Sequence, residues 1–195
     1  MKKTLAAIAV LVVLLAAYSV WPFFALYDLA RAVQAADVPK IERRVDFPAL
    51  RRSLSGQIMQ MLAQRSGIGI EPTGLIANLA SAFANPLIEG LVTPAALAEL
   101  LKNGWPGAIL ADRPAGFEGL DPNTLGTAWQ LYANSRYGVG TFRMWLPANL
   151  PRERQFRIEL ALSGLTWKLT GLGLPPELLE RLARELLKQE KKLGG

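Results

Sequence analysis

The chain has 195 residues, 51% of them hydrophobic, and a formal net charge of +6. This length fits one domain of ordinary size together with a short extra segment. The sequence contains no cysteine and no histidine, which excludes disulfides, thiol nucleophiles, zinc–thiolate sites and a Ser-His-Asp triad. The positive charge is modest and spread along the chain, so it does not indicate a nucleic-acid-binding protein.

The first segment is apolar and long enough to cross a membrane. Leu5 to Ala17 contains no polar residue, and Thr4 to Trp21 would be about 27 Å long as a helix. Tyr18 and Trp21 fall where interfacial aromatic residues are expected. The lysines before the segment and the charge-balanced stretch after it favour a cytoplasmic N-terminus. We therefore expect a transmembrane anchor that contacts membrane lipid through Thr4 to Trp21.

A cleaved signal peptide is the alternative for the same segment. It has a basic start, an apolar centre, and the small residues Ala17 and Ser19 at the positions that precede a cleavage site. Against cleavage, Val20 to Leu26 is also strongly apolar, so a cut after Ser19 would leave an exposed apolar end.

The next part of the chain carries a series of helix signals. Pro22 predicts a kink or a new helix start, followed by an amphipathic helix that ends near Ala36. Asp37 and Asp46 are candidate N-caps of two further helices, and Gly67 is a candidate C-terminal stop. Later helices are expected at 75–84, at 86–92, and from a Thr93-Pro94 cap to just before Gly104. Residues 103–124 are rich in Gly, Pro and Asp and predict a long connection.

Four segments alternate apolar and polar residues, which is typical of strands with one buried face. They are TAWQLYA (127–133), GTFRMWL (140–146), QFRIELAL (155–162) and LTWKLT (165–170). Ser163-Gly164 predicts a two-residue hairpin connection, and 134–138 and 147–154 predict the other turns. An amphipathic helix is expected at the C-terminus, with acidic residues near its start and lysines near its end.

Helices followed by a meander predict an α+β fold. We expect an N-terminal membrane helix, several helices packed on a four-stranded antiparallel meander, and a C-terminal amphipathic helix. The arrangement is similar to cystatin-like and NTF2-like domains, as an analogy of fold only. The expected parts are an anchor or signal segment (1–21), an α+β domain (22–175) and the C-terminal helix (176–195).

Two stretches of the chain carry a family pattern. WPFFALYDLARAVQAADVPKIERRVDFPALRRSL (21–54) contains a W-P-x-x-A-L-x-x-L-A-x-A-x-x-x-x-D run and a V-D-F-P-x-L-R-x-S-L run, and GLTWKLTGLGLP (164–175) contains a strand pattern. In these features the chain resembles a bacterial family known as domain of unknown function 2939, over most of residues 18–175. The family has no assigned activity, so the resemblance implies location and domain extent but no functional residues.

Four arginines close to the anchor form a candidate basic cluster: Arg43, Arg44, Arg51 and Arg52. Contact with anionic lipid head groups stabilises by about 1 kcal/mol for each basic residue near a charged surface, and an acidic partner is a second possibility. The alternative is a solvated helix face whose charges pair locally with Glu42 and Asp46.

The predicted strands carry the other candidate residues. Trp129 and Trp167 alternate in step with the apolar residues of their predicted strands, so we expect them to pack in the core. Tyr132 and Trp145 lie at the alternate, polar positions, which makes them candidates for a ligand pocket or an interface.

Glu159 forms a separate candidate site. Together with Arg157 on its own strand and Arg143 on a neighbouring strand, it predicts a polar site on the outer face of the sheet. Ordinary cross-strand ion pairs explain the same pattern.

The sequence contains no Walker A, GxSxG or HExxH pattern. We therefore expect no enzymatic activity, no cofactor and no metal. The expected function is a non-catalytic binding or interaction module at the cell envelope. We expect the protein to cross the inner membrane once and to place its domain in the periplasm. An envelope protein is the candidate partner, and no nucleic acid is expected. The alternative is a periplasmic carrier of a small apolar ligand, released by cleavage near Ser19, and an enzyme of unrecognised type comes third.

Overall fold

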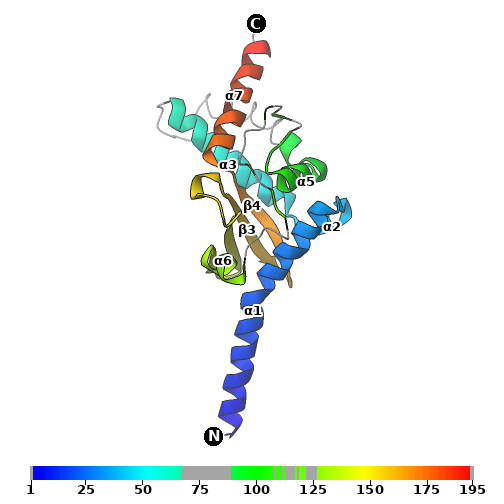
Figure 1. The fold of residues 1–195 in the computed structure, drawn as a ribbon, viewed down its shortest axis with the longest axis vertical. Coiled ribbons are helices and arrows are strands. Elements are labelled where there is room, and N and C mark those ends of the chain that lie inside the picture. Colours follow the sequence, from blue (N-terminus) through cyan, green and yellow to red (C-terminus); the bar gives the residue numbers. More distant parts are fainter. Residues whose placement is uncertain are drawn as a thin grey trace.

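The computed structural model describes residues 2–66, 89–107, 109–110, 112, 117, 119–121 and 127–193. The molecule is elongated, because helix α1 (Lys2–Gln34) leaves the domain at one end and helix α7 (Pro176–Leu193) at the other (Figure 1). Between them lie further helices and a four-stranded sheet. This arrangement confirms the α+β fold with an antiparallel meander.

Helix α1 is a single helix, although Pro22 lies inside it. Of the two outcomes predicted at this proline, a kink or a new helix start, the new start is therefore wrong. Residues 2–17 are exposed, whereas burial begins at the proline. The buried residues of α1 are Pro22, Ala25, Leu26, Leu29, Ala30, Ala32 and Val33. One helix thus forms both an apolar stem and part of the domain core.

The two caps predicted from aspartates are confirmed. Helix α2 (Val38–Arg44) begins after Asp37, whose carboxylate accepts a hydrogen bond of 3.1 Å from the backbone N–H three residues later. Helix α3 (Phe47–Ser66) begins after Asp46, which accepts the equivalent bond at 2.9 Å. Each cap satisfies an N–H that has no partner inside its helix.

Helix α5 (Pro94–Asn103) begins and ends as predicted. The hydroxyl of Thr93 accepts a hydrogen bond of 3.2 Å from the N–H of Ala96. Gly104 ends the helix with a φ of 68°, a left-handed conformation that glycine adopts without strain.

Some predicted features fall on residues that the structure does not describe. Gly67 and the helix at 75–84 lie outside the described residues, and the helix at 86–92 is described only from residue 89, with 89–91 helical. The described residues between 104 and 121 form no helix or strand, in agreement with the predicted long connection.

The sheet is an antiparallel meander in the order β1-β2-β3-β4. Its strands are β1 (Ser135–Gly138), β2 (Thr141–Leu146), β3 (Phe156–Ser163) and β4 (Thr166–Gly173). The last three confirm predicted strands. Ser163 pairs with Thr166, so the turn consists of Gly164 and Leu165, one residue later than predicted.

The first predicted strand is wrong, because TAWQLYA forms helix α6 (Ala128–Ala133). Thr127 and Gln130 make a capping box, in which each side chain accepts a hydrogen bond from the backbone N–H of the other. The segment that follows, predicted as a turn, is β1. Trp129, predicted to lie in the core, is 74% exposed on α6.

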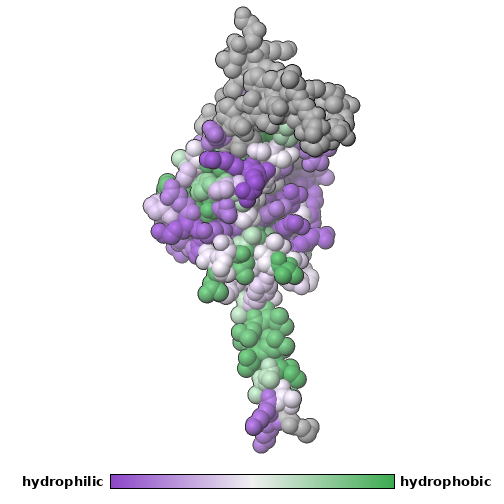
Figure 2. Space-filling model, turned by 180° about the vertical axis from the view of Figure 1, so that it is seen from behind, coloured by the Kyte–Doolittle hydropathy of each residue, from purple (hydrophilic) through white to green (hydrophobic). Residues whose placement is uncertain are grey.

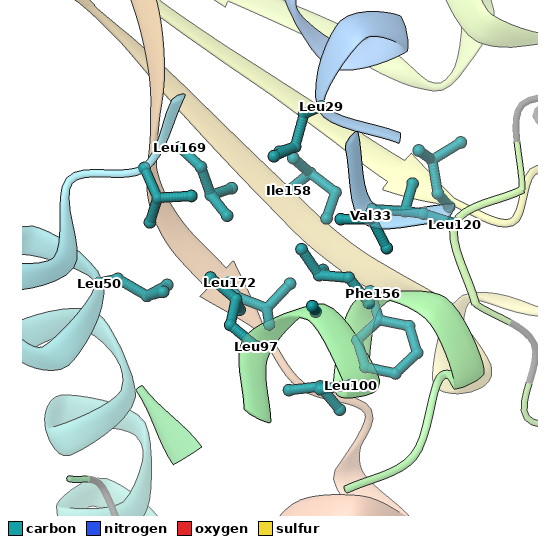
Figure 3. Close-up of a cluster of buried hydrophobic side chains, with 14 of the residues drawn as sticks. Leu29, Val33, Leu50, Leu97, Leu100, Leu120, Phe156, Ile158, Leu169 and Leu172 are labelled. Carbon is teal, nitrogen blue, oxygen red and sulfur yellow. The ribbon is translucent and has the colours of Figure 1, made fainter. Parts of the chain in front are cut away.

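The core lies between the apolar face of the sheet and helices α1, α3 and α5. Figure 3 shows leucine and valine side chains of the helices meeting those of the strands. The labelled core residues are Leu29, Val33, Leu50, Leu97, Leu100, Leu120, Phe156, Ile158, Leu169 and Leu172. Trp167 is 1% exposed, so its predicted place in the core is confirmed.

A β-bulge changes the side-chain phase of β4. Glu159 pairs with Gly171 and Leu160 pairs with Leu169, so Thr170 is an extra residue on β4. As a consequence, the next buried leucine comes three residues after Leu169 instead of two.

Helix α3 covers the edge of β4, which would otherwise present unpaired backbone groups. The N–H of Asp46 donates to the carbonyl of Leu169 at 2.8 Å. The amide of Gln57 donates to the carbonyl of Leu172 at 2.8 Å and accepts from the N–H of Leu174 at 3.0 Å. A single glutamine thus satisfies two edge groups.

The two ends of the sheet continue into different structures. The connection from β2 to β3 contains the short 3-10 helix η1 (Arg152–Arg154) and is held by buried Gln155, whose amide donates to two of its carbonyls at 2.9 Å. After β4, α7 buries Leu178 and Leu182, which agrees with the predicted amphipathic helix.

Candidate interaction surface on the outer face of the sheet

The outer face of the sheet, opposite the core, carries a linked set of charged residues. The Nε of Arg157 lies 2.9 Å from Oε1 of Glu159, and the Nε of Arg143 lies 3.4 Å from the same oxygen. Arg143 and Glu159 are directly opposite each other on β2 and β3. One carboxylate therefore holds two guanidinium groups on adjacent strands.

Two glycines of β4 give these long side chains room. Gly171 pairs with Glu159 and Gly173 pairs with Arg157. A Cβ at Gly173 would lie 2.8 Å from Cβ of Arg157, and one at Gly171 would lie 2.9 Å from the Glu159 carboxylate. The glutamate and arginine side chains thus lie over β4 where a larger residue would block them.

Trp145 adds an aromatic surface to this face. It pairs with Arg157 across β2 and β3, and the guanidinium of Arg152 lies 4.6 Å from the ring centroid. This distance is within the range of a cation–π contact.

The outer face carries more positive than negative charge. Arg136 and Arg143 are directly opposite each other on β1 and β2, and Lys168 occupies an outward position on β4. Glu159 is the acidic residue among these outward strand positions. A surface of this kind suits an anionic group or an acidic protein surface.

The arrangement does not resemble a general acid–base site. Such sites use two groups whose pKa values have been moved apart, whereas Glu159 is a single carboxylate between two guanidinium groups. Within the described ranges, no group of three or more His, Cys, Asp or Glu side chains is placed to hold a metal ion.

Three of the four predicted pocket or interface residues lie on this one face: Arg143, Trp145 and Glu159. The fourth, Tyr132, lies on α6 and is 60% exposed. Sequence reasoning missed Arg136, Arg152 and the spacing function of the β4 glycines. The Gly-x-Gly pattern at 171–173, in a strand that pairs with a charged one, was the available signal.

The predicted basic cluster is divided between two helices. Arg43 and Arg44 belong to α2, and Arg51 and Arg52 belong to α3. Arg44 is engaged by Asp28 of α1, with 2.8 Å between its Nη2 and Oδ2. The predicted contact of this basic cluster with lipid head groups stays a prediction.

Asp28 joins α1 to α2 through two cations. Lys40 lies 2.5 Å from Oδ1 of Asp28, on the other side from Arg44. Burial alone would raise the pKa of Asp28, but hydrogen bonds from Lys40 and Arg44 together with their charges outweigh burial and lower it.

The junction between α1 and the domain is built from aromatic side chains. The ring of Tyr18 lies 5.9 Å from that of Trp167, and its hydroxyl accepts a hydrogen bond of 3.2 Å from the N–H of Gly140. The hydroxyl of Tyr137 donates to the carbonyl of Ser19. Residues upstream of Pro22 therefore contact the folded domain.

Tyr137 is held in its neutral form at this junction. Burial raises its pKa to about 12, with smaller contributions from Tyr132 and Tyr18. Its hydroxyl therefore stays a donor to the Ser19 carbonyl even near pH 10.0, where an ordinary tyrosine would be half ionised. That carbonyl is next to the one whose helical hydrogen bond Pro22 removes.

Two hollows are found among the described residues, and they differ in size and character. A cavity of about 10 Å³ lies between α5 and the sheet, lined by apolar residues that include Leu100, Leu146 and Phe156. It has room for about one water molecule. An open cleft of about 440 Å³ lies between α7 and the residues Trp105, Ile109, Leu110 and Asp112, and part of that connection is outside the described residues.

The fold and the surface define a class of protein: an α+β domain carried on a long apolar helix, with a positively charged outer sheet face. Residues 11–100 match the family model described as "Protein of unknown function (DUF2939)", which confirms the family resemblance over this region. The pattern noted at 164–175 lies beyond the match. Comparisons with curated proteins and with solved structures found no match, so the cystatin-like and NTF2-like comparison stays an analogy.

Proposed function

We propose that this protein is an uncleaved, single-pass membrane protein whose domain acts as a non-catalytic interaction module at the cell envelope. In this proposal Thr4 to Trp21 spans the inner membrane with a cytoplasmic N-terminus, and the domain faces the periplasm. The outer face of the sheet recognises an anionic group on an envelope partner.

The continuity of α1 is the observation that best supports an uncleaved anchor. Its first half is exposed and apolar enough to cross a membrane, whereas its second half lies in the core. Cleavage after Ser19 would remove Tyr18 from its place beside Trp167 and would remove the carbonyl that Tyr137 binds. The fold thus uses residues that a signal peptidase would discard.

The small cavity between α5 and the sheet favours an interaction module over a carrier that holds an apolar ligand inside the core. Ligand pockets for small molecules measure about 300–1,000 Å³, and this cavity measures about 10 Å³. The open cleft beside α7 is within that range, but Arg181, Arg184 and Glu185 line part of it, so it does not suit a purely apolar ligand. The linked charged residues lie instead on the outer face of the sheet, where Arg143 and Arg157 are about half exposed.

Replacement of two outer-face arginines tests the proposed module. We expect Arg143→Gln combined with Arg157→Gln to lower capture of a partner from native membranes by at least about tenfold, the effect of about 1.4 kcal/mol in binding. Both side chains are about half exposed, so the fold should be kept. Arg184→Gln on α7 is the matched control, because it removes one exposed arginine from another surface.

Equal capture by the double variant and the wild-type chain would contradict recognition through this face. Sensitivity to salt provides a second measurement, because a charge-based contact weakens as ionic strength rises. A captured partner that is retained equally at low and high salt would also count against the proposal.

A further inference from the structure

Two hairpin tips lie together where α1 leaves the domain; we call this end the base. In an antiparallel meander the β1–β2 and β3–β4 turns share one end of the sheet. The N–H of Leu162 donates to the carbonyl of Gly140 at 2.9 Å, which links the two hairpins there. Gly140 in turn contacts Tyr18 of α1.

Both tips expose an aliphatic side chain at their most projecting position. Val139 is fully exposed and Leu165 is 80% exposed. Neither turn contains a charged residue: the first reads GVGT and the second SGLT. Single exposed aliphatic residues are common on protein surfaces, but here two come from separate hairpins at the same end.

Exposed aromatic residues extend this apolar end. Trp129 and Tyr132 of α6 stack with their ring centroids 5.9 Å apart, and Tyr132 is close enough to influence the pKa of Tyr137 at the junction. Trp21 and Phe24 are exposed on α1 just beyond the junction. Figure 2 shows apolar side chains gathered around the base beside the apolar stem, below a mostly hydrophilic domain.

The opposite end of the sheet has a different character. The connection from β2 to β3 contains Arg152, Glu153 and Arg154 in succession, and all three are exposed. The charge therefore differs between the two ends of the same strands: uncharged aliphatic tips at the base, and a charged turn away from it.

From this polarity we propose that the base lies in the lipid interface. Val139 and Leu165 insert among the upper acyl chains, and Trp129 and Tyr132 lie at the level of the head groups. Tryptophan and tyrosine favour this zone because each has an apolar ring and a polar group. The proposal rests on the proposed anchor, whose apolar stem leaves the domain from this same surface.

The contact gives the domain a fixed orientation on the membrane. A single helix would let the domain tilt, whereas three separate contacts around α1 hold it with the strands pointing away from the bilayer. With the strands pointing away from the bilayer, the outer face of the sheet is not covered by lipid and stays accessible to a partner.

Site-specific fluorescence in vesicles tests the contact. The chain has no cysteine, so Val139→Cys, Leu165→Cys and the control Glu153→Cys can each carry one bimane label. The full chain is reconstituted in vesicles of phosphatidylcholine and phosphatidylglycerol that contain a lipid spin-labelled near the head group. We expect quenching at 139 and 165 to exceed that at 153 at least about twofold, because the first two sites lie in the interface.

A fourth label at Leu11→Cys separates this proposal from the anchor. That position lies about 10 Å further along α1 than Tyr18, so lipid spin-labelled deep in the chain should quench it. Deep quenching at 11, with quenching at 139 and 165 no greater than at 153, would overturn the base contact and leave the anchor intact. Absence of quenching at 11 would overturn both.

The same labels detect the competing occupants. Protection of 139 and 165 from aqueous iodide without quenching by lipid would show that a second copy or another protein covers the base, and would overturn the lipid contact. The side chains replaced at 139, 153 and 165 are exposed on the domain, and Leu11 is exposed on the apolar stem of α1. Circular dichroism checks that each labelled chain keeps its fold.

Discussion

Truncation of Leu29 in α1 tests whether the long apolar helix is also part of the domain core. Leu29 is 1% exposed and lies beside Ile158 in the core (Figure 3). Leu29→Ala removes a buried isobutyl group and leaves a cavity, so we expect a loss of about 3 kcal/mol in the free energy of unfolding. Leu11 is 56% exposed on the same helix, and Leu11→Ala is the control.

Urea unfolding of the full chain in detergent micelles measures both variants. Tryptophan fluorescence follows the transition, because Trp167 is buried in the folded domain. A loss of about 3 kcal/mol at Leu29 would shift the midpoint to lower urea, while Leu11→Ala should change the free energy of unfolding by less than about 0.5 kcal/mol. Equal, small effects would refute the structural role of α1.

Three further predictions test separate contacts. Gly173→Ala should lower the free energy of unfolding by about 1–2 kcal/mol, because its Cβ would lie 2.8 Å from the Cβ of Arg157 on the paired strand. Gly56→Ala, which has open space around it on α3, should raise the free energy of unfolding by about 1 kcal/mol. Urea titration measures both variants. Gln57→Leu should lower the free energy of unfolding by about 2 kcal/mol, because it leaves the carbonyl of Leu172 and the N–H of Leu174 unpaired. The control Gln60→Leu, at an exposed position of α3, should change it little. Equal losses in the two variants would contradict the pairing of Gln57 with the β4 edge. The lowered pKa of Asp28 contributes stability above its unfolded pKa that is lost as pH falls through the folded pKa. Asp28→Asn should therefore be less stable than wild type at pH 7 and similar to it near pH 2, and parallel pH profiles would refute this.

Local patterns predicted most helices and strands, but one competing local signal reversed a prediction. TAWQLYA alternates like a strand, yet the Thr127 and Gln130 capping box makes it a helix. The T-x-x-Q spacing is visible in the sequence and was the stronger signal. With that segment helical, Tyr132 becomes part of an exposed α6 instead of a strand, and the first strand moves to 135–138.

Tertiary contacts explain the features that no local pattern indicated. Pro22 does not end α1, because the residues on either side of it pack against the domain: Tyr18 against Trp167, and Leu26 in the core. The bulge at Thr170 depends on how β3 and β4 pair. Sequence period placed Arg143, Trp145 and Glu159 on one face, but only the strand register showed their partners.

We propose that the N-terminal segment is retained as an anchor that continues into the domain. Intact mass measurement of the protein purified from separated membrane and soluble fractions shows whether it is present. We expect a chain of about 21.3 kDa, with its N-terminal segment present, in the membrane fraction. Recovery of a shorter chain that begins at Val20 in the soluble fraction would contradict it.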